Sequence, residues 1–256
     1  MRNSILFDIG ATKTRMAYLA DGENFETPII FETPKNFDEA VLLFTKKALS
    51  IAGDRAIESV VGGMSRAIFG GYDSFREKIE NELKVKVTIE NDAALAGLGE
   101  AIYGAGKDFS IVAYITVSTG VGGAKIVNGK IDERTIGFEP GKQIIDINTG
   151  KTLEDMISGR ALAERSGMHP KEITDPNVWD EHAKFLAIGL NNIIVEWSPN
   201  VVVLGGSMIT GNPSIPLDKV EEYLKQILKV FPEIPAIKKA TLGDFGGLWG
   251  ALAYLK

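Results

Sequence analysis

Two segments far apart in the sequence share one pattern, and this repetition constrains the fold more than any other feature. The segments are ILFDIGATKTRMAYL at residues 5–19 and VAYITVSTGVGGAKIV at residues 112–127. Each consists of an apolar strand, a turn of small residues and a second apolar strand. Glycines and threonines in such turns expose backbone N–H groups and hydroxyls that can hold phosphate oxygens. We therefore expect a cleft with a phosphate-binding turn on each side; two ordinary hairpins with glycine turns are the alternative.

Neither turn matches the best-known nucleotide motifs. A P-loop needs four residues between its first glycine and its Gly-Lys pair, and GATK lacks that spacing. The GVGG of residues 120–123 is followed by a strand and a hairpin, where a dinucleotide fingerprint requires a helix. Both motifs are therefore excluded, and support for phosphate binding is limited to the exposed N–H groups and hydroxyls of the two turns.

Strands and helices alternate along the rest of the chain, which predicts an α/β protein. Apolar alternation or short apolar runs predict strands at Ser4–Ile9, Arg15–Ala20, residues 85–89, Ile57–Val61, Ile111–Val117, Gly123–Val127, Asn200–Gly206 and Ile237–Leu242. Caps and apolar stripes predict helices at Asp38–Ala52, Leu153–Gly167, Trp179–Trp197, Leu217–Val230 and from Leu248 onward. Asp38 is the candidate cap of the first helix, and the predicted linkers are YGAGKD near Gly104 and LGDFGG near Asp244.

The composition limits the classes of partner. With 256 residues, 45% of them apolar, the chain can bury a large core in one or two domains. A net charge of −6 disfavours nucleic acid as the main partner and a role at membrane surfaces. The absence of cysteine excludes disulfides and fits a reducing compartment. A first strand that begins at Ser4 leaves no room for a signal peptide, so we expect a cytoplasmic protein.

The stretch IENDAALAG at residues 89–97 places two polar residues, Asn91 and Asp92, between a strand and an apolar helix. Either residue could cap the helix, because Asn and Asp are favoured N-caps. Asp92 could also act as a general base. On these residues alone, capping and chemistry remain open alternatives.

Five motifs, in order, resemble the ROK family of sugar kinases and sugar-responsive repressors. They are DIGATK (8–13), ENDAALAGLGE (90–100), TVSTGVGGAKIVNGKI (116–131), VVVLGGS (201–207) and FGGLWGAL (245–252). The resemblance implies the two-domain actin-like ATPase fold, also called ribonuclease H-like, with a deep cleft. The smaller domain would comprise residues 1–104 and 244–256, and the larger domain residues 105–243.

The resemblance also implies roles in binding MgATP. Asp8 would hold Mg²⁺, through water, since magnesium loses its water reluctantly. The other expected nucleotide contacts lie in the two turns and at the end of one strand: Gly10, Thr12, Lys13, Ser118, Thr119, Gly120, Gly122, Gly123, Gly205, Gly206 and Ser207. Glycine at the strand end would let the nucleotide approach the backbone.

On the acceptor side, the resemblance makes Asp92 the base that takes a proton from the sugar hydroxyl, with Asn91 binding another hydroxyl. Relatives carry Glu-x-Gly-His, whose histidine contacts the sugar and often zinc. Here Glu139 is kept but Lys142 replaces the histidine, and Glu154 matches a second sugar-binding glutamate. Because the cysteines of the zinc segment are also missing, we expect no zinc site. Lys142 could pair with either glutamate.

The segment VGGMSRAIFGGYDSF at residues 61–75 also departs from relatives, which have a Pro-Gly turn and a longer hairpin that closes over the sugar. Arg66 could point toward the acceptor, or it could lie on the surface. Neither histidine, His169 nor His182, matches a ligand or base pattern.

These observations leave three functions open. The first is an ATP-dependent kinase for a hexose or N-acetylhexosamine, which we expect to be a homodimer. The second is a sugar sensor or regulator without a DNA-binding region, since only seven residues precede Asp8. The third is a glucokinase that uses polyphosphate.

Overall fold

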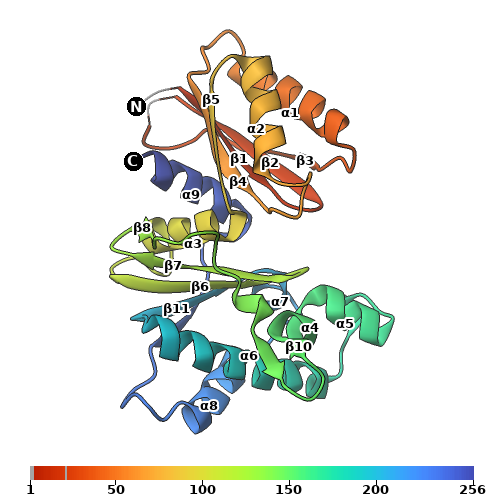
Figure 1. Cartoon of the computed structure of the whole chain (residues 1–256), viewed down its shortest axis with the longest axis vertical. Coiled ribbons are helices and arrows are strands. Elements are labelled where there is room, and N and C mark those ends of the chain that lie inside the picture. Colours follow the sequence, from red (N-terminus) through yellow and green to blue (C-terminus); the bar gives the residue numbers. More distant parts are fainter. Residues whose placement is uncertain (1–2, 21) are drawn as a thin grey trace. The chain divides into compact units, whose positions relative to one another are not determined.

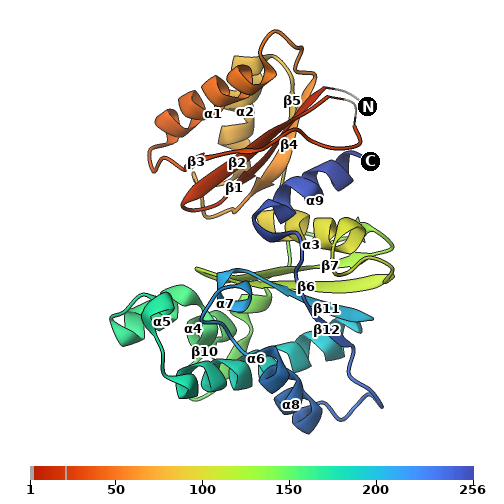
Figure 2. The same ribbon diagram turned by 180° about the vertical axis from the view of Figure 1, so that it is seen from behind.

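A computed structural model describes residues 3–20 and 22–256, and the chain forms a mixed α/β protein (Figures 1 and 2). It divides into two compact units. Unit 1 runs to Gly99 and takes in Asp244–Lys256 from the far end of the sequence, and unit 2 is the continuous stretch Glu100–Gly243. Among the described residues, none of the helices is both long and apolar enough to span a bilayer.

The sheet of unit 1 has the strand order β3-β2-β1-β4-β5. Strands β1, β2 and β3 pair antiparallel, whereas β4 pairs parallel with both β1 and β5. The strands are β1 (Ser4–Ile9), β2 (Lys13–Leu19), β3 (Ile29–Glu32), β4 (Ser59–Met64) and β5 (Lys86–Glu90). The first predicted hairpin therefore forms the centre of this sheet.

Helices cover both faces of this sheet. One face of β1, which includes Phe7, packs against α1 (Phe37–Ala52) and α2 (Tyr72–Leu83). Successive side chains of a strand point to opposite faces, so Asp8 faces the other way. That face is covered by α9 (Gly246–Leu255), which contacts β1 and β4. Asp8 thus lies on the side of the sheet completed by the far end of the sequence.

Unit 2 repeats the arrangement, with the strand order β12-β11-β6-β7-β8. Here β6, β7 and β8 form the antiparallel part, and β11 pairs parallel with β6 and β12. The strands are β6 (Ile111–Val117), β7 (Val121–Val127), β8 (Lys130–Ile131), β11 (Val201–Gly205) and β12 (Ala236–Lys239). In each unit the first strand of a hairpin pairs with a parallel strand on its other side.

The core of unit 2 lies between this sheet and its helices, and it includes the apolar face of the long helix α6. The helices are α4 (Leu153–Ile157), α5 (Gly159–Ser166), α6 (Pro176–Trp197), α7 (Ser207–Thr210) and α8 (Leu217–Ile227). A small two-stranded sheet, β9 (Ile144–Asp146) and β10 (Lys151–Thr152), precedes α4. Both histidines have structural contacts: His182 is buried on α6, and His169 caps a short turn.

Helix α3 (Asp92–Tyr103) crosses from unit 1 into unit 2. Its residue Glu100 is buried, and its carboxylate accepts hydrogen bonds from the N–H groups of Ala105, Thr241 and Leu242 at 2.8, 2.9 and 2.8 Å. Ala105 follows α3, and Thr241 and Leu242 lie just before the chain returns to unit 1. One carboxylate therefore joins the beginning and the end of unit 2.

Two predictions about helices were wrong. The expected single helix Leu153–Gly167 is two helices, because Ser158 takes an extended conformation and its side chain caps α5 by accepting from the N–H of Ala161 at 3.2 Å. The cap of α1 is Asn36, which accepts from the N–H of Glu39, and Asp38 lies inside the first turn.

Candidate functional site

The turn between β1 and β2 is exposed and held in shape by hydrogen bonds. The N–H of Gly10 donates to the carbonyl of Lys13 at 3.0 Å, and the hydroxyl of Thr33 donates to the carbonyl of Gly10 at 2.8 Å. The N–H of Thr33 also donates to the carbonyl of Thr12. The side chains of Thr12 and Lys13 are exposed at the tip. This turn can offer a hydroxyl and a positive charge to a phosphate.

Asp8 precedes this turn and is shielded from water. Its side chain is 16% exposed, and Gly247 of α9 lies so close that a Cβ there would be 2.7 Å from the carboxyl carbon of Asp8. Arg15 lies directly opposite in the β1–β2 register, and its guanidinium is 3.5 Å from the carboxylate. Burial and the nearby charge of Asp92 raise the pKa of Asp8 to about 7, and Arg15 offsets only part of that rise.

Asn91 and Asp92 lie at the start of α3 and accept different backbone hydrogen bonds. The side-chain oxygen of Asn91 accepts from the N–H of Ala94 at 3.0 Å, so Asn91 is the cap of α3. Asp92 is the first residue of the helix, and its carboxylate accepts from the adjacent N–H of Ala93. Gly63 of β4 lies against this turn, since a Cβ there would be 2.9 Å from the Cα of Asp92. Of the two candidate caps, Asn91 and Asp92, the side chain of Asn91 makes the capping hydrogen bond.

The segment between β4 and α2 is short and anchored by an aromatic ring. Phe69 has a left-handed backbone (φ 56°), and its ring stacks on Phe75 with centroids 5.7 Å apart. The guanidinium of Arg66 is exposed and lies 5.3 Å from the centre of the Tyr72 ring. Burial raises the pKa of Tyr72, while the neighbouring Arg66 and Asn91 lower it. Arg66 and Asn91 therefore both lie close enough to Tyr72 to affect its pKa.

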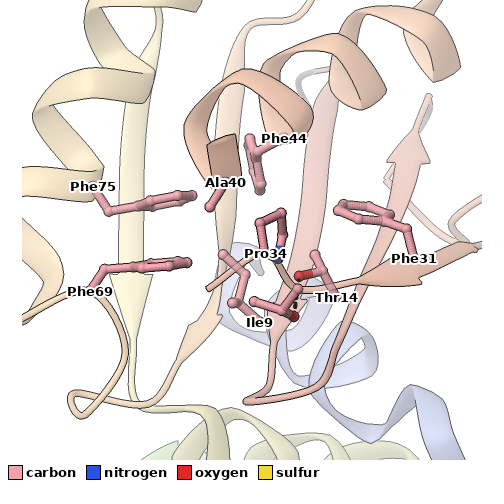
Figure 3. A pocket seen from close by; sticks show the side chains of 9 residues that line it. Ile9, Thr14, Phe31, Pro34, Ala40, Phe44, Phe69 and Phe75 are labelled. Carbon is pink, nitrogen blue, oxygen red and sulfur yellow. Dashed lines mark hydrogen bonds between the residues drawn. The ribbon is translucent and has the colours of Figure 1, made fainter. Parts of the chain in front are cut away.

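An apolar pocket of unit 1 lies beside this segment but on the opposite face of the sheet from Asp8. Figure 3 shows the rings of Phe69 and Phe75 side by side at its wall. It is lined by Ile9, Thr14, Phe31, Thr33, Pro34, Ala40, Phe44, Phe69 and Phe75. Among the described residues that line it, none has a charged side chain, so this pocket offers no positive charge to a phosphate.

The matching turn of unit 2 joins β6 to β7 through Ser118, Thr119 and Gly120. The N–H of Ser118 donates to the carbonyl of Gly120, and the N–H of Gly159 donates to the carbonyl of Ser118 at 2.7 Å. The hydroxyl of Ser118 is 3.2 Å from that of Ser207, at the start of α7. The structure therefore brings together the two predicted nucleotide-binding stretches of this unit.

The glycines after β11 have packing reasons of their own. A Cβ at Gly205 would be 2.6 Å from the hydroxyl oxygen of Tyr114. Gly206 has a left-handed backbone (φ 86°) and lies against the carbonyl of Val117. Gly123, on β7, similarly has no room for a side chain beside the carbonyl of Tyr114, whereas Gly122 pairs with Thr116 in the sheet. Packing against neighbouring residues therefore accounts for Gly205, Gly206 and Gly123 without any contact to a ligand.

Glu154 on α4 is a buried carboxylate surrounded by donors. One oxygen accepts from the ammonium of Lys142 at 2.7 Å and from the guanidinium of Arg160 at 3.0 Å. The other accepts from the N–H of Val121 at 2.9 Å. Burial would raise the pKa of Glu154, but the hydrogen bonds from Lys142 and Val121 and the charge of Arg160 together lower it. Of the two glutamates considered as partners of Lys142, Glu154 is the one in contact; Glu139 is exposed.

The donor set around Asp8 suits magnesium better than a transition metal. Within residues 3–20 and 22–256, three or more His, Cys, Asp or Glu side chains nowhere gather as a metal cluster. Mg²⁺ prefers oxygen ligands and usually keeps several waters, binding through one or two carboxylates and the phosphates of its substrate. Asp8, with the charge of Asp92 nearby, fits such an ion. The absence of zinc stays a prediction.

Three residues near these sites, Arg15, Asp244 and Arg160, were not predicted from the sequence. Arg15 contacts Asp8 and also Asp244, whose carboxylate is 3.5 Å from the guanidinium. Arg160 contacts Glu154. Arg15 could have been found, because a tight turn after Asp8 places it opposite that residue. The contact of Arg160 depends on the break at Ser158, which the sequence pattern concealed.

Comparisons with known proteins agree with this architecture. A sequence model described as the ROK family matches residues 66–256. The N-acetyl-D-glucosamine kinase of Mannheimia succiniciproducens is 27% identical over 96% of this chain and 97% of its own. The xylose repressor of Bacillus spizizenii is 26% identical over 61% of this chain and 46% of its own. With two further relatives, 33% and 29% identical, the chain spans about half of their length, 50% and 49%.

A solved structure extends the agreement to the whole fold. The ROK family glucokinase from Streptomyces griseus, in complex with glucose and AMPPNP, superposes with a TM-score of 0.80 over 98% of each chain at 22% identity. This likeness confirms the predicted α/β, actin-like fold.

Proposed function

This chain belongs to the ROK family, and from that premise we propose that it is an ATP-dependent sugar kinase. It would transfer the γ-phosphoryl group of ATP to a hydroxyl of a hexose or N-acetylhexosamine. The observation that carries the proposal is the pair Asn91–Asp92: Asn91 caps α3, and the Asp92 carboxylate lies close enough to Asp8 for its charge to raise the pKa of Asp8. Kinases among the relatives support the reaction class.

In the proposed mechanism, Asp92 accepts the proton of the attacking hydroxyl, a contribution of about a hundred- to ten-thousandfold in rate. The amide nitrogen of Asn91 would donate to another hydroxyl, because its oxygen is occupied by the helix cap. Glu139, Lys142 and Glu154 would bind the sugar. The contacts around Glu154 make it a fixed acceptor, while Lys142 has a half-exposed side chain that can donate.

We propose that Gly10, Thr12 and Lys13 bind phosphate in unit 1. In unit 2, we propose that Ser118, Thr119 and Ser207 bind nucleotide, with the glycines of the β6–β7 turn and of β11 permitting close approach. Asp8 would hold Mg²⁺ through water. The ion, when bound, neutralises charge on the phosphates during transfer. We also propose two domains, 1–104 with 244–256 and 105–243, which differ from the two units only in the assignment of residues 100–104. We further propose that the protein works as a cytoplasmic homodimer.

A xylose repressor among the relatives favours a second candidate, a sugar sensor without catalysis. A coupled kinase assay across a panel of hexoses and N-acetylhexosamines, with ATP and with polyphosphate as donors, tests both. We expect turnover with ATP for at least one sugar. Sugar and nucleotide binding without turnover across the panel would favour the sensor, and turnover with polyphosphate alone would change the donor.

A further inference from the structure

Arg15 is a partly buried cation between two carboxylates, and neither carboxylate lies at the usual distance of a charged hydrogen bond. One terminal nitrogen is 3.5 Å from the carboxylate of Asp8, and the other is 3.5 Å from that of Asp244. Both distances are long for charged hydrogen bonds, which are typically about 2.7–2.9 Å. Among the described residues, its buried Nε has no hydrogen-bond partner. Arg15 is therefore close to Asp8 without the paired geometry that a structural ion pair with arginine usually has.

The charges around Arg15 do not balance. Among the described residues, the carboxylates of Asp92 and Asp244 act to raise the pKa of Asp8, and the charge of Arg15 acts to lower it. Three carboxylates and one guanidinium give a net charge of −2 when all are ionised. A single divalent cation has the charge that is missing.

The position of Arg15 is set by the sheet and not by a flexible surface. Arg15 is directly opposite Asp8 on β2, and its side chain is only 17% exposed. Asp244, in contrast, has a side chain 74% exposed and lies in the segment that leads into α9. The guanidinium can therefore shift toward the solvated Asp244 and leave Asp8 without disturbing the strands.

We propose that Arg15 is a positioning residue that stands in for the divalent cation: it holds the Asp8 carboxylate in the metal-free protein and yields it when the ion arrives. This inference rests on the proposed role of Asp8 in the kinase. It assigns Arg15 a competing role, since Arg15 and the ion neutralise the same carboxylate. Removal of Arg15 should therefore strengthen metal binding. If Arg15 only maintained the shape of the site, its removal would weaken metal binding.

The test measures binding of Mn²⁺ alone, followed by its electron paramagnetic resonance signal, to the full chain at about pH 8, where the carboxylates are ionised. Arg15→Met keeps the aliphatic part of the side chain and removes the charge, so we expect Mn²⁺ to bind about tenfold more tightly. Arg15→Lys should bind Mn²⁺ like the wild type. Arg55→Met, which removes an exposed arginine that pairs with Glu26 in the same unit, is the matched control and should change nothing.

Asp244→Asn gives a second measurement in case Arg15→Met does not fold. It removes the exposed competitor for Arg15, so Arg15 should hold Asp8 more firmly and Mn²⁺ should bind several-fold more weakly. Unchanged or weaker binding in Arg15→Met, or binding by no variant at all, would overturn the inference. Asp8→Asn distinguishes failure of the proposed role of Asp8 from failure of the proposed role of Arg15. If Asp8→Asn leaves Mn²⁺ binding in the presence of ATP unchanged, the proposed role of Asp8 is wrong. If Asp8→Asn abolishes Mn²⁺ binding but Arg15→Met does not change it, only the role of Arg15 is rejected.

Discussion

Asp8 in unit 1 and Glu154 in unit 2 are both shielded carboxylates at predicted ligand sites, yet burial has opposite outcomes for them. Asp8 has one distant cation and carboxylate neighbours, so its pKa rises to about 7. Glu154 has Lys142, Arg160 and a backbone N–H, so its pKa falls below its ordinary value. The difference shows which charge the protein has already neutralised. The charge of Glu154 is already neutralised by protein donors, so this side chain can present an oxygen in a fixed position. The charge of Asp8 is not neutralised by the protein in this way.

The largest expected effect comes from Asp92, the neighbour whose charge contributes to the high pKa of Asp8. Asp92→Asn should lower turnover at least about a hundredfold, because the proposed base is lost. Nucleotide affinity should change little, and the fold should survive because Asn91 remains as the helix cap. Steady-state kinetics with circular dichroism as the folding control provide the measurement. A folded variant with wild-type turnover would reject Asp92 as the base.

The second prediction uses the pH dependence that the comparison implies. The folded protein keeps a proton on Asp8 up to about pH 7, whereas the unfolded chain releases it near the ordinary value of 3.8. The unfolding free energy should therefore fall as the pH rises through this window, by about 2–3 kcal/mol between pH 5 and pH 7.

Urea unfolding in metal-free buffer at the two pH values, for wild type and Asp8→Asn, isolates this contribution. The buried His182, whose lowered pKa acts in the opposite direction, is the same in both proteins. Equal pH dependence in the two would contradict the raised pKa of Asp8.

The third prediction is a pair of matched substitutions with opposite signs at neutral pH. Asp8→Asn should raise the unfolding free energy by about 1–2 kcal/mol, since it removes a poorly neutralised buried charge. Glu154→Gln should lower it by about 1–2 kcal/mol, because it removes the acceptor of Lys142 and Arg160; both are about half exposed, which limits the cost. Changes of the same sign in the two variants would break the comparison.

The smallest effect is expected at Lys142, where relatives have histidine. Lys142→His removes one of the donors to Glu154 but leaves Arg160 and the N–H of Val121 in place, so the carboxylate should stay ordered. We expect a several-fold change in the ratio of kcat/KM between two sugars, with the KM for ATP unchanged. This corresponds to about 1 kcal/mol, the size of a single hydrogen bond. Unchanged kinetics for every acceptor would remove Lys142 from the sugar site.

The sequence predicted the hairpins and the α/β class well because both depend on local patterns. The repeated strand–turn–strand segments are the hairpins β1–β2 and β6–β7, each at the centre of its sheet. Short edge strands such as β3, with four residues, carry too little pattern to be recognised. The break at Ser158 was missed because the apolar spacing continues across it, and only the serine cap separates the two helices.

The candidate site was predictable where one motif contains the whole contact. One short motif contains both Asn91 and Asp92, and another contains the whole turn after Asp8. The environment of Glu154 was predictable only in part. Lys142 was one of its expected partners, but the donors at Val121 and Arg160 come from separate segments and were not expected. The same is true of Asp244, which reaches Arg15 only because α9 packs on the sheet of unit 1.

Because α9 completes unit 1, the order of synthesis on the ribosome matters for this protein. Unit 2 is one continuous stretch, so all its residues are synthesised before residues 244–256. Until α9 has been synthesised, the face of the unit 1 sheet that bears Leu6 and Val61 cannot be covered by that helix. Incomplete apolar surfaces of this kind are prone to aggregation. We therefore expect nascent chains that stall before residue 244 to depend on chaperones, although their first five strands are already complete.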